Sequence, residues 1–131
     1  MYLRFTTEFI NEYNEAETGV FQALGYLRNN PSTQDGDVVK LKILNKWFSS
    51  NLEKPTRFSN ATSKSPVSVS LSWFKDSAKE HLHKMSELTE VLEKYDLVVE
   101  RLVTKNPGYI VYEDDYQVSA VPFRNDRNRV I

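Results

Sequence analysis

The stretch from 98 to 123 restricts the possible folds of this chain more than any other part. Three runs rich in Val, Ile and Tyr follow one another there, separated by Pro107-Gly108 and by Glu113-Asp114-Asp115. Proline presets the first dihedral angle of a tight turn, and glycine accepts the positive φ that follows. We therefore expect strands at 98–104 and 109–112 and a third that ends near Pro122, joined as an antiparallel meander with an acidic hairpin tip.

The second hairpin of this meander has two possible registers. A two-residue turn at Asp114-Asp115 would set Ile110 and Tyr112 opposite Ser119 and Gln117. A three-residue turn at 113–115 instead gathers five residues on one face: Ile110, Tyr112, Tyr116, Val118 and Ala120. We favour the second register because it collects these five residues, most of them apolar or aromatic, on a single face of the hairpin. Three residues then lie on the opposite face, which stays open to solvent or to a partner: Tyr109, Val111 and Val121.

The first half of the chain predicts one strand and two helices. Apolar and polar residues alternate over 2–6, which is typical of a half-buried strand. Apolar residues then recur every three or four positions, which predicts a helix over 15–29 that Asn29-Asn30-Pro31 ends. A second helix follows Asp35-Gly36-Asp37, where an acidic residue can cap free amides, and it ends at Pro55.

The longest helical stripe lies in the second half of the chain. It runs from Trp73 to Tyr95, with Ser72 as the N-cap and with Leu82 and Met85 in the core. A short strand over 67–71 is a further possibility, because Val67, Val69 and Leu71 alternate with serines.

The predicted order β-α-α-(β)-α-β-β-β indicates an α+β fold. We expect an antiparallel sheet of about four strands that three helices cover on one face. The 131 residues fit a single domain, 1–131, with a long polar loop at 54–66 and a polar tail at 124–131.

Composition excludes several classes of protein. The chain has no cysteine, so disulfides and thiolate metal sites are absent, and its net charge of -1 argues against a dominant attraction to nucleic acid. It has no apolar run long enough for a membrane span and no signal peptide pattern. We therefore expect a cytoplasmic protein that does not bind a membrane.

The candidate catalytic and metal-binding groups are few. His81 and His83 lie two apart on a predicted helix and point in different directions, so they cannot share one metal ion. The acidic tip at 113–115 could bind a cation or hold a proton, since adjacent carboxyl groups raise one another's pKa, but turn chemistry already explains aspartate there. We expect no metal and no cofactor.

The polar loop is a candidate anion site. Lys54, Arg57 and Lys64 flank Ser and Thr residues, and a guanidinium can hold a phosphate or a carboxylate through two parallel hydrogen bonds. The region 40–64 also combines basic residues with Trp47, Phe48 and Phe58, which resembles the mixture of rings and charge that single-stranded nucleic acid favours, although core packing explains Trp47 and Phe48 more simply.

Three short motifs resemble a group of small bacterial proteins that are uncharacterised. They are Trp73-Phe74-Lys75-x-Ser77-Ala78, Pro107-Gly108-Tyr109-x-Val111-Tyr112-Glu113-Asp114 and Gln117-Val118. The resemblance covers most of the chain and implies a protein of the bacterial cytosol, of a phage or of another mobile element. It implies no catalytic residue and no activity.

The sequence favours a small interaction or regulatory module without catalysis, because it shows a complete core, an open sheet face and no catalytic group of residues. The partner would be another protein or a second copy of the chain. A rival reading is an ADP-ribosyltransferase-like enzyme that uses Arg4, a serine among Ser68, Ser70 and Ser72, and Glu113. A third is an anion or nucleic-acid binder that uses the loop at 54–64.

Overall fold

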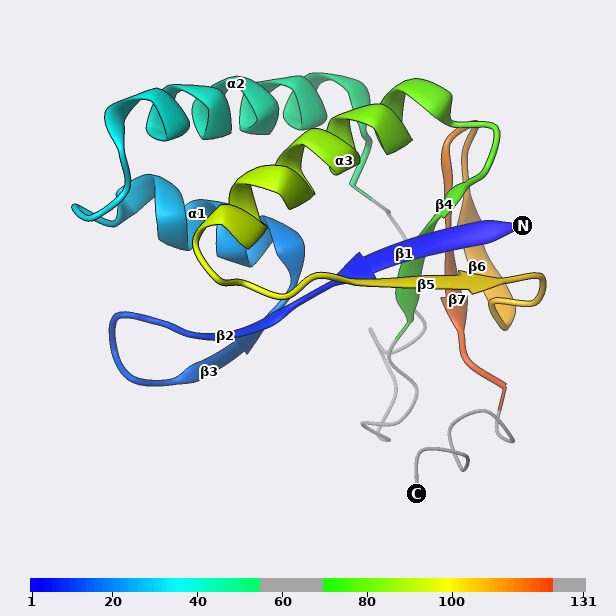
Figure 1. Ribbon diagram of the computed structural model, residues 1–131. Helices are drawn as coiled ribbons and strands as arrows, with labels where there is room; N and C mark the ends of the chain where they lie inside the picture. The colour runs from blue at the N-terminus through cyan, green and yellow to red at the C-terminus, as the bar shows by residue number, and fades with distance from the viewer. Residues whose placement is uncertain (55–69, 124–131) are drawn as a thin grey trace. The chain divides into compact units, whose positions relative to one another are not determined.

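A computed structural model describes residues 1–54 and 70–123 (Figure 1). Its strands and helices, in chain order, are β1 (Tyr2–Thr6), β2 (Glu8–Ile10), β3 (Ala16–Thr18), α1 (Val20–Asn29), α2 (Asp35–Asn51), β4 (Leu71–Lys75), α3 (Lys79–Lys94), β5 (Glu100–Thr104), β6 (Tyr109–Glu113) and β7 (Gln117–Val121). The predicted loop at 54–66 lies outside the described residues except for Lys54, and the predicted tail at 124–131 lies outside them entirely.

The protein has the α+β architecture that the sequence predicts. The main sheet is antiparallel, with the strand order β5-β1-β4-β7-β6, so it has five strands where about four were expected. A second, two-stranded sheet pairs β2 with β3. Three helices are present in the described part of the chain, in agreement with the prediction. No helix in residues 1–54 and 70–123 combines the length and the apolar character that crossing a membrane requires.

The chain divides into two compact units. One, here called the sheet unit, comprises 1–4, 54–79 and 103–131, and the other, here called the helical unit, comprises 5–53 and 80–102. Strands β1 and β5 each contribute residues to both units, so neither unit is a continuous segment of sequence.

The core of the sheet unit is built around β7, which pairs with β4 on one side and with β6 on the other (Figure 1). Gln117, Val118, Ser119 and Ala120 are all buried. A strand that is buried on both faces must satisfy its polar side chains internally. The Ser119 hydroxyl accordingly lies 3.1 Å from the Ser72 hydroxyl of β4.

The β6–β7 hairpin adopts neither of the registers considered from the sequence. Ile110 pairs with Ala120, but Tyr112 pairs with Ser119, so Val111 is an extra residue that forms a β-bulge. The favoured three-residue turn at 113–115 was therefore wrong, because β6 continues to Glu113 and the connection spans Asp114 to Tyr116.

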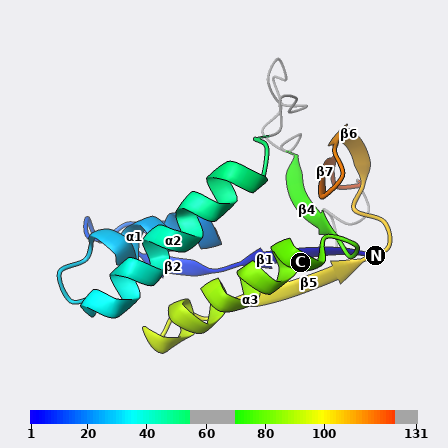
Figure 2. The same ribbon diagram turned by 90° about the horizontal axis from the view of Figure 1, so that it is seen from above.

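In the helical unit, α2 and α3 run antiparallel, as Figure 2 shows, and touch at both ends. At one end the His81 Nε2 atom of α3 lies 2.7 Å from the backbone oxygen of Asn51, where α2 finishes. At the other end the Tyr95 hydroxyl donates to the Asp37 carboxylate (2.6 Å) and accepts from the Gln34 N–H (3.0 Å). Asp35 and Asp37 lie in the first turn of α2, but the helix begins without a side-chain cap, contrary to the capping role proposed for this acidic pair.

The helix predicted over 15–29 begins at Val20. The preceding residues form β3, which pairs with β2 in a hairpin that the helical period of 15–29 does not predict. Gly19 separates β3 from α1 with φ 124°, a conformation that an L-residue rarely adopts, so the helical period cannot continue through it.

The helix predicted from Trp73 begins instead at Lys79. Trp73 and Phe74 lie on β4, where they pair with Val118 and Gln117 of β7, and Ser72 is a strand residue rather than an N-cap. A strand is present in this region, but it spans Leu71–Lys75 where the sequence suggests 67–71. Residues 67–69 lie outside the described residues. Met85 is buried as predicted, but Leu82 is only half-buried.

Candidate functional site

The predicted interaction face lies on β6 and at the end of β7. Tyr109 pairs with Val121, and its ring packs edge-on against the ring of Phe123 with 4.8 Å between the ring centroids. The Tyr109 side chain nevertheless remains 65% exposed. Val121 and Val111 are half-buried, and Val111 is the bulge residue.

At its first two residues, β6 exposes a side chain on each face of the sheet. Neighbouring residues of a strand point to opposite faces, and Tyr109 and Ile110 are both exposed, Ile110 by 44%. In the strand order β6 is the last strand, so one of its backbone edges has no strand partner among the described residues. An edge strand can pair with another chain through its backbone N–H and C=O groups.

The hairpin tip is organised around Asp114. Its Oδ1 atom accepts hydrogen bonds from the backbone N–H groups of Tyr116 (2.9 Å) and Gln117 (3.0 Å), and its Oδ2 atom accepts from the Tyr112 hydroxyl (2.9 Å) and the Gln117 amide (3.1 Å). Burial alone would raise the pKa of the Asp114 carboxyl, but these hydrogen bonds outweigh it and hold the pKa below its usual value. The group is therefore not a proton donor poised near neutral pH.

The residues of the proposed ADP-ribosyltransferase reading have other partners. Arg4 donates to the backbone oxygen of Ser72 (3.2 Å), and burial lowers the pKa of its guanidinium. The Glu113 carboxylate binds Lys75 at 2.6 Å, and this hydrogen bond raises the pKa of Lys75. Ser70 is buried, and Ser68 lies outside the described residues.

The candidate anion site in the polar loop falls largely beyond the described structure. Lys54 is exposed at the end of the described segment, whereas Arg57 and Lys64 lie outside the described residues. Trp47, considered as a base-stacking residue, is half-buried and packs edge-on against Phe48 and His81. The Lys84 ammonium lies 5.7 Å from the centroid of the Trp47 ring, within the range of a cation–π contact.

The two histidines lie in different environments, as their spacing on a helix requires. His81 is buried, whereas His83 is exposed and lies 4.0 Å from the Glu87 carboxylate. In residues 1–54 and 70–123, no three metal-ligating side chains come close enough together to hold an ion.

Two features of the open edge did not emerge from the sequence. The sequence predicts Ile110 on the apolar face of the hairpin, and it does not predict the bulge at Val111. Five residues of β6, 109–113, oppose four of β7, 118–121, and the alternation of apolar and polar residues does not mark the extra one. Asp114 is a sequence signal for the start of the hairpin connection alone, since aspartate commonly accepts hydrogen bonds from N–H groups of its own turn.

Comparison of the chain with protein-family models, with curated proteins and with solved structures found no match.

Proposed function

We propose that this protein is a protein-binding module that takes up an extended segment of another protein as an additional strand beside β6. The observation that carries the proposal is the exposure of two successive residues, Tyr109 and Ile110, on the last strand of the sheet. In strand addition the backbone groups of the edge provide affinity, and the side chains on the two faces provide specificity. A tyrosine that is held by a neighbouring ring, as Phe123 holds Tyr109, loses less side-chain entropy on binding.

The composition of the two edge strands favours β6 over β5. Charged residues on an edge strand discourage pairing with other chains, and β5 carries Glu100 and Arg101 side by side. Strand β6 carries a single charged residue, Glu113, and Lys75 already neutralises it. The bulge at Val111 limits how far a bound strand can pair, because it interrupts the regular ladder. The proposed partner is therefore a short segment that pairs beside Tyr109 and Ile110.

The test is a binding measurement with defined peptides. Short random peptides displayed on phage are selected on the intact protein, and the affinity of each selected peptide is measured by fluorescence anisotropy. Tyr109→Lys and Ile110→Lys should each weaken binding by at least about tenfold, which corresponds to about 1.4 kcal/mol. Circular dichroism should show an unchanged fold, because both side chains are exposed.

Tyr13→Lys is the matched control. Tyr13 is a tyrosine that is 74% exposed, and it lies in the turn between β2 and β3 of the helical unit. Selected peptides that bind all three variants as tightly as the wild type would refute the proposal. Light scattering tests the alternative partner: self-association that Ile110→Lys abolishes would make the partner a second copy of the chain.

A further inference from the structure

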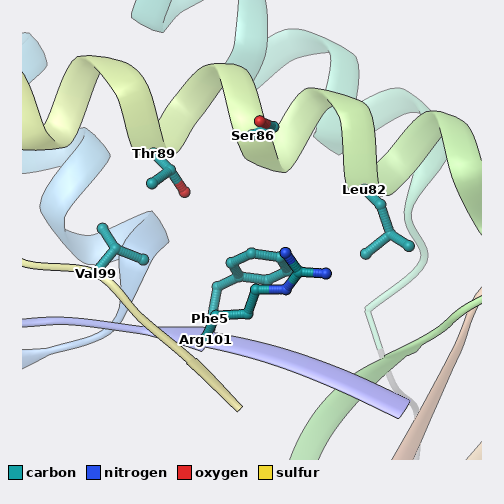
Figure 3. A pocket seen from close by; sticks show the side chains of 6 residues that line it. All are labelled: Phe5, Leu82, Ser86, Thr89, Val99 and Arg101. Carbon is teal, nitrogen blue, oxygen red and sulfur yellow. The ribbon is translucent and has the colours of Figure 1, made fainter. Parts of the chain in front are cut away.

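The helical unit contains an open cavity of about 200 Å³ that plays no part in the β6 proposal. It lies between α3 on one side and Phe5 of β1 with the segment 99–101 on the other (Figure 3). Six residues line it: Phe5, Leu82, Ser86, Thr89, Val99 and Arg101.

The lining combines apolar walls with a few polar groups, as small-molecule sites do. Leu82 and Thr89 point from α3 into the space, and the Arg101 side chain extends from β5 toward α3 (Figure 3). Phe5 and Val99 complete the apolar wall. The cavity thus has an apolar body and one cationic group.

Two of the polar groups have unused hydrogen-bonding capacity. The Thr89 Oγ1 atom is buried and has no hydrogen-bond partner among the described residues, although a helical threonine commonly donates to a carbonyl of the preceding turn. Figure 3 shows this hydroxyl oxygen on the side of the cavity. Arg101 is exposed and forms no ion pair with any described residue. A buried hydroxyl without a partner destabilises the folded state, and a ligand that accepts its hydrogen bond removes this penalty.

We infer that this cavity binds a small carboxylate with an aromatic or branched apolar body. The carboxylate accepts hydrogen bonds from the Arg101 guanidinium and from the Thr89 hydroxyl, which are donors of the kind that anions require. The apolar body packs against Phe5, Leu82 and Val99. An apolar cavity of about 150 Å³ admits benzene, so one of about 200 Å³ has room for a single ring and its carboxylate. A single cation and a largely apolar wall suit a monoanion better than a phosphate dianion.

Phenylacetate is the probe, and its binding is followed through the backbone amide shifts of the full chain in NMR titrations. We expect saturable shifts of the amides of Ser86, Thr89 and Arg101. Phenylacetamide has the same shape without the charge and should bind at least about tenfold more weakly, since it lacks a charge-assisted pair. Equal binding of phenylacetate and phenylacetamide, or no saturable shift with phenylacetate, would overturn the inference. Inorganic phosphate that shifts the same amides at lower concentration would also overturn it.

Two variants test the assigned roles. Arg101→Gln should weaken phenylacetate binding by at least about tenfold, while the matched control Arg28→Gln, on α1 and away from the cavity lining, should leave it unchanged. Thr89→Val replaces a buried hydroxyl by a methyl group of similar size. It should weaken phenylacetate binding and raise the unfolding midpoint of the ligand-free protein, because an unpaired polar group is removed. A Thr89→Val variant that is less stable and binds phenylacetate normally would assign the threonine a structural role and contradict the proposed site.

Discussion

Asp114 shows how one carboxylate can determine the geometry of a hairpin. Its two oxygens accept four hydrogen bonds, two from backbone N–H groups and two from side chains of the same hairpin. An aspartate in an acidic turn reads from the sequence as a solvated residue, because the sequence does not reveal which donors the turn will bring to it. The structure makes it the organising residue of the turn.

The first prediction concerns the pH dependence of stability. Because the pKa of Asp114 is lower in the folded state than its usual value of 3.8, its ionised form stabilises the fold above that value. This contribution should be lost as the pH falls below 3.8 toward the lowered pKa. Asp114→Ala should cost about 1–3 kcal/mol at neutral pH, and the difference from the wild type should shrink at low pH. Urea denaturation at several pH values measures it, and a difference that is constant down to pH values below 3.8 would contradict this role.

A second prediction separates two residues that the helical period treats alike. Met85 is 1% exposed, whereas Leu82 faces the open cavity and is half-buried. Met85→Ala should cost about 2–5 kcal/mol, because it leaves a void in the core. Leu82→Ala should cost less, because the half-buried Leu82 side chain buries less apolar area on folding and the substitution therefore removes less of it. Chemical denaturation of both variants decides the order, and an equal or larger loss for Leu82→Ala would contradict the placement of α3.

At the scale of the elements, the sequence predicts the existence of the helices and strands better than it predicts the residues at which they begin. Trp73 and Phe74 fit the apolar period of α3, yet they also continue the alternation that begins at Leu71, and pairing with β7 decides for the strand. Likewise, residues 16–18 fit the period of α1, but they pair with β2 instead. In both cases pairing with another strand, β7 for Trp73 and Phe74 and β2 for residues 16–18, overrides the local periodicity.

The third prediction tests how α2 is held at its first turn. The Tyr95 hydroxyl, just beyond α3, bonds to both Asp37 and the Gln34 N–H. The hydrogen bond from Tyr95 and the contact with Lys94 also lower the pKa of Asp37. Tyr95→Phe should destabilise the protein by about 1 kcal/mol and speed amide hydrogen exchange in the first turn of α2. Tyr26→Phe is a matched control in the helical unit, because the ring of Tyr26 packs against Phe9 and the substitution keeps that ring. Unchanged exchange at the start of α2 in Tyr95→Phe would show that the helix is held by other contacts.

At the scale of the whole molecule, the two units carry separate candidate sites. The sheet unit presents the open edge at β6, and the helical unit contains the open cavity beside α3 for which we infer a carboxylate ligand. The sequence predicts an open sheet face with Tyr109, Val111 and Val121, because strand alternation places residues on faces, but it does not predict the bulge at Val111. It could not show that β6 is the last strand, since strand order depends on how distant segments pair. The cavity was also beyond prediction, because its lining comes from three segments that are separated in sequence.

Amide hydrogen exchange of the intact protein, with and without a peptide selected for binding, tests the central claim most directly. Strand addition gives outward backbone N–H groups at the start of β6 new acceptors, so exchange in the segment around Tyr109 and Ile110 should slow when the peptide is bound. The same peptide should leave exchange in the β2–β3 hairpin unchanged, since that hairpin belongs to the other unit. Protection confined to segments other than β6, at a peptide concentration that saturates the protein, would contradict the assignment of β6 as the binding edge.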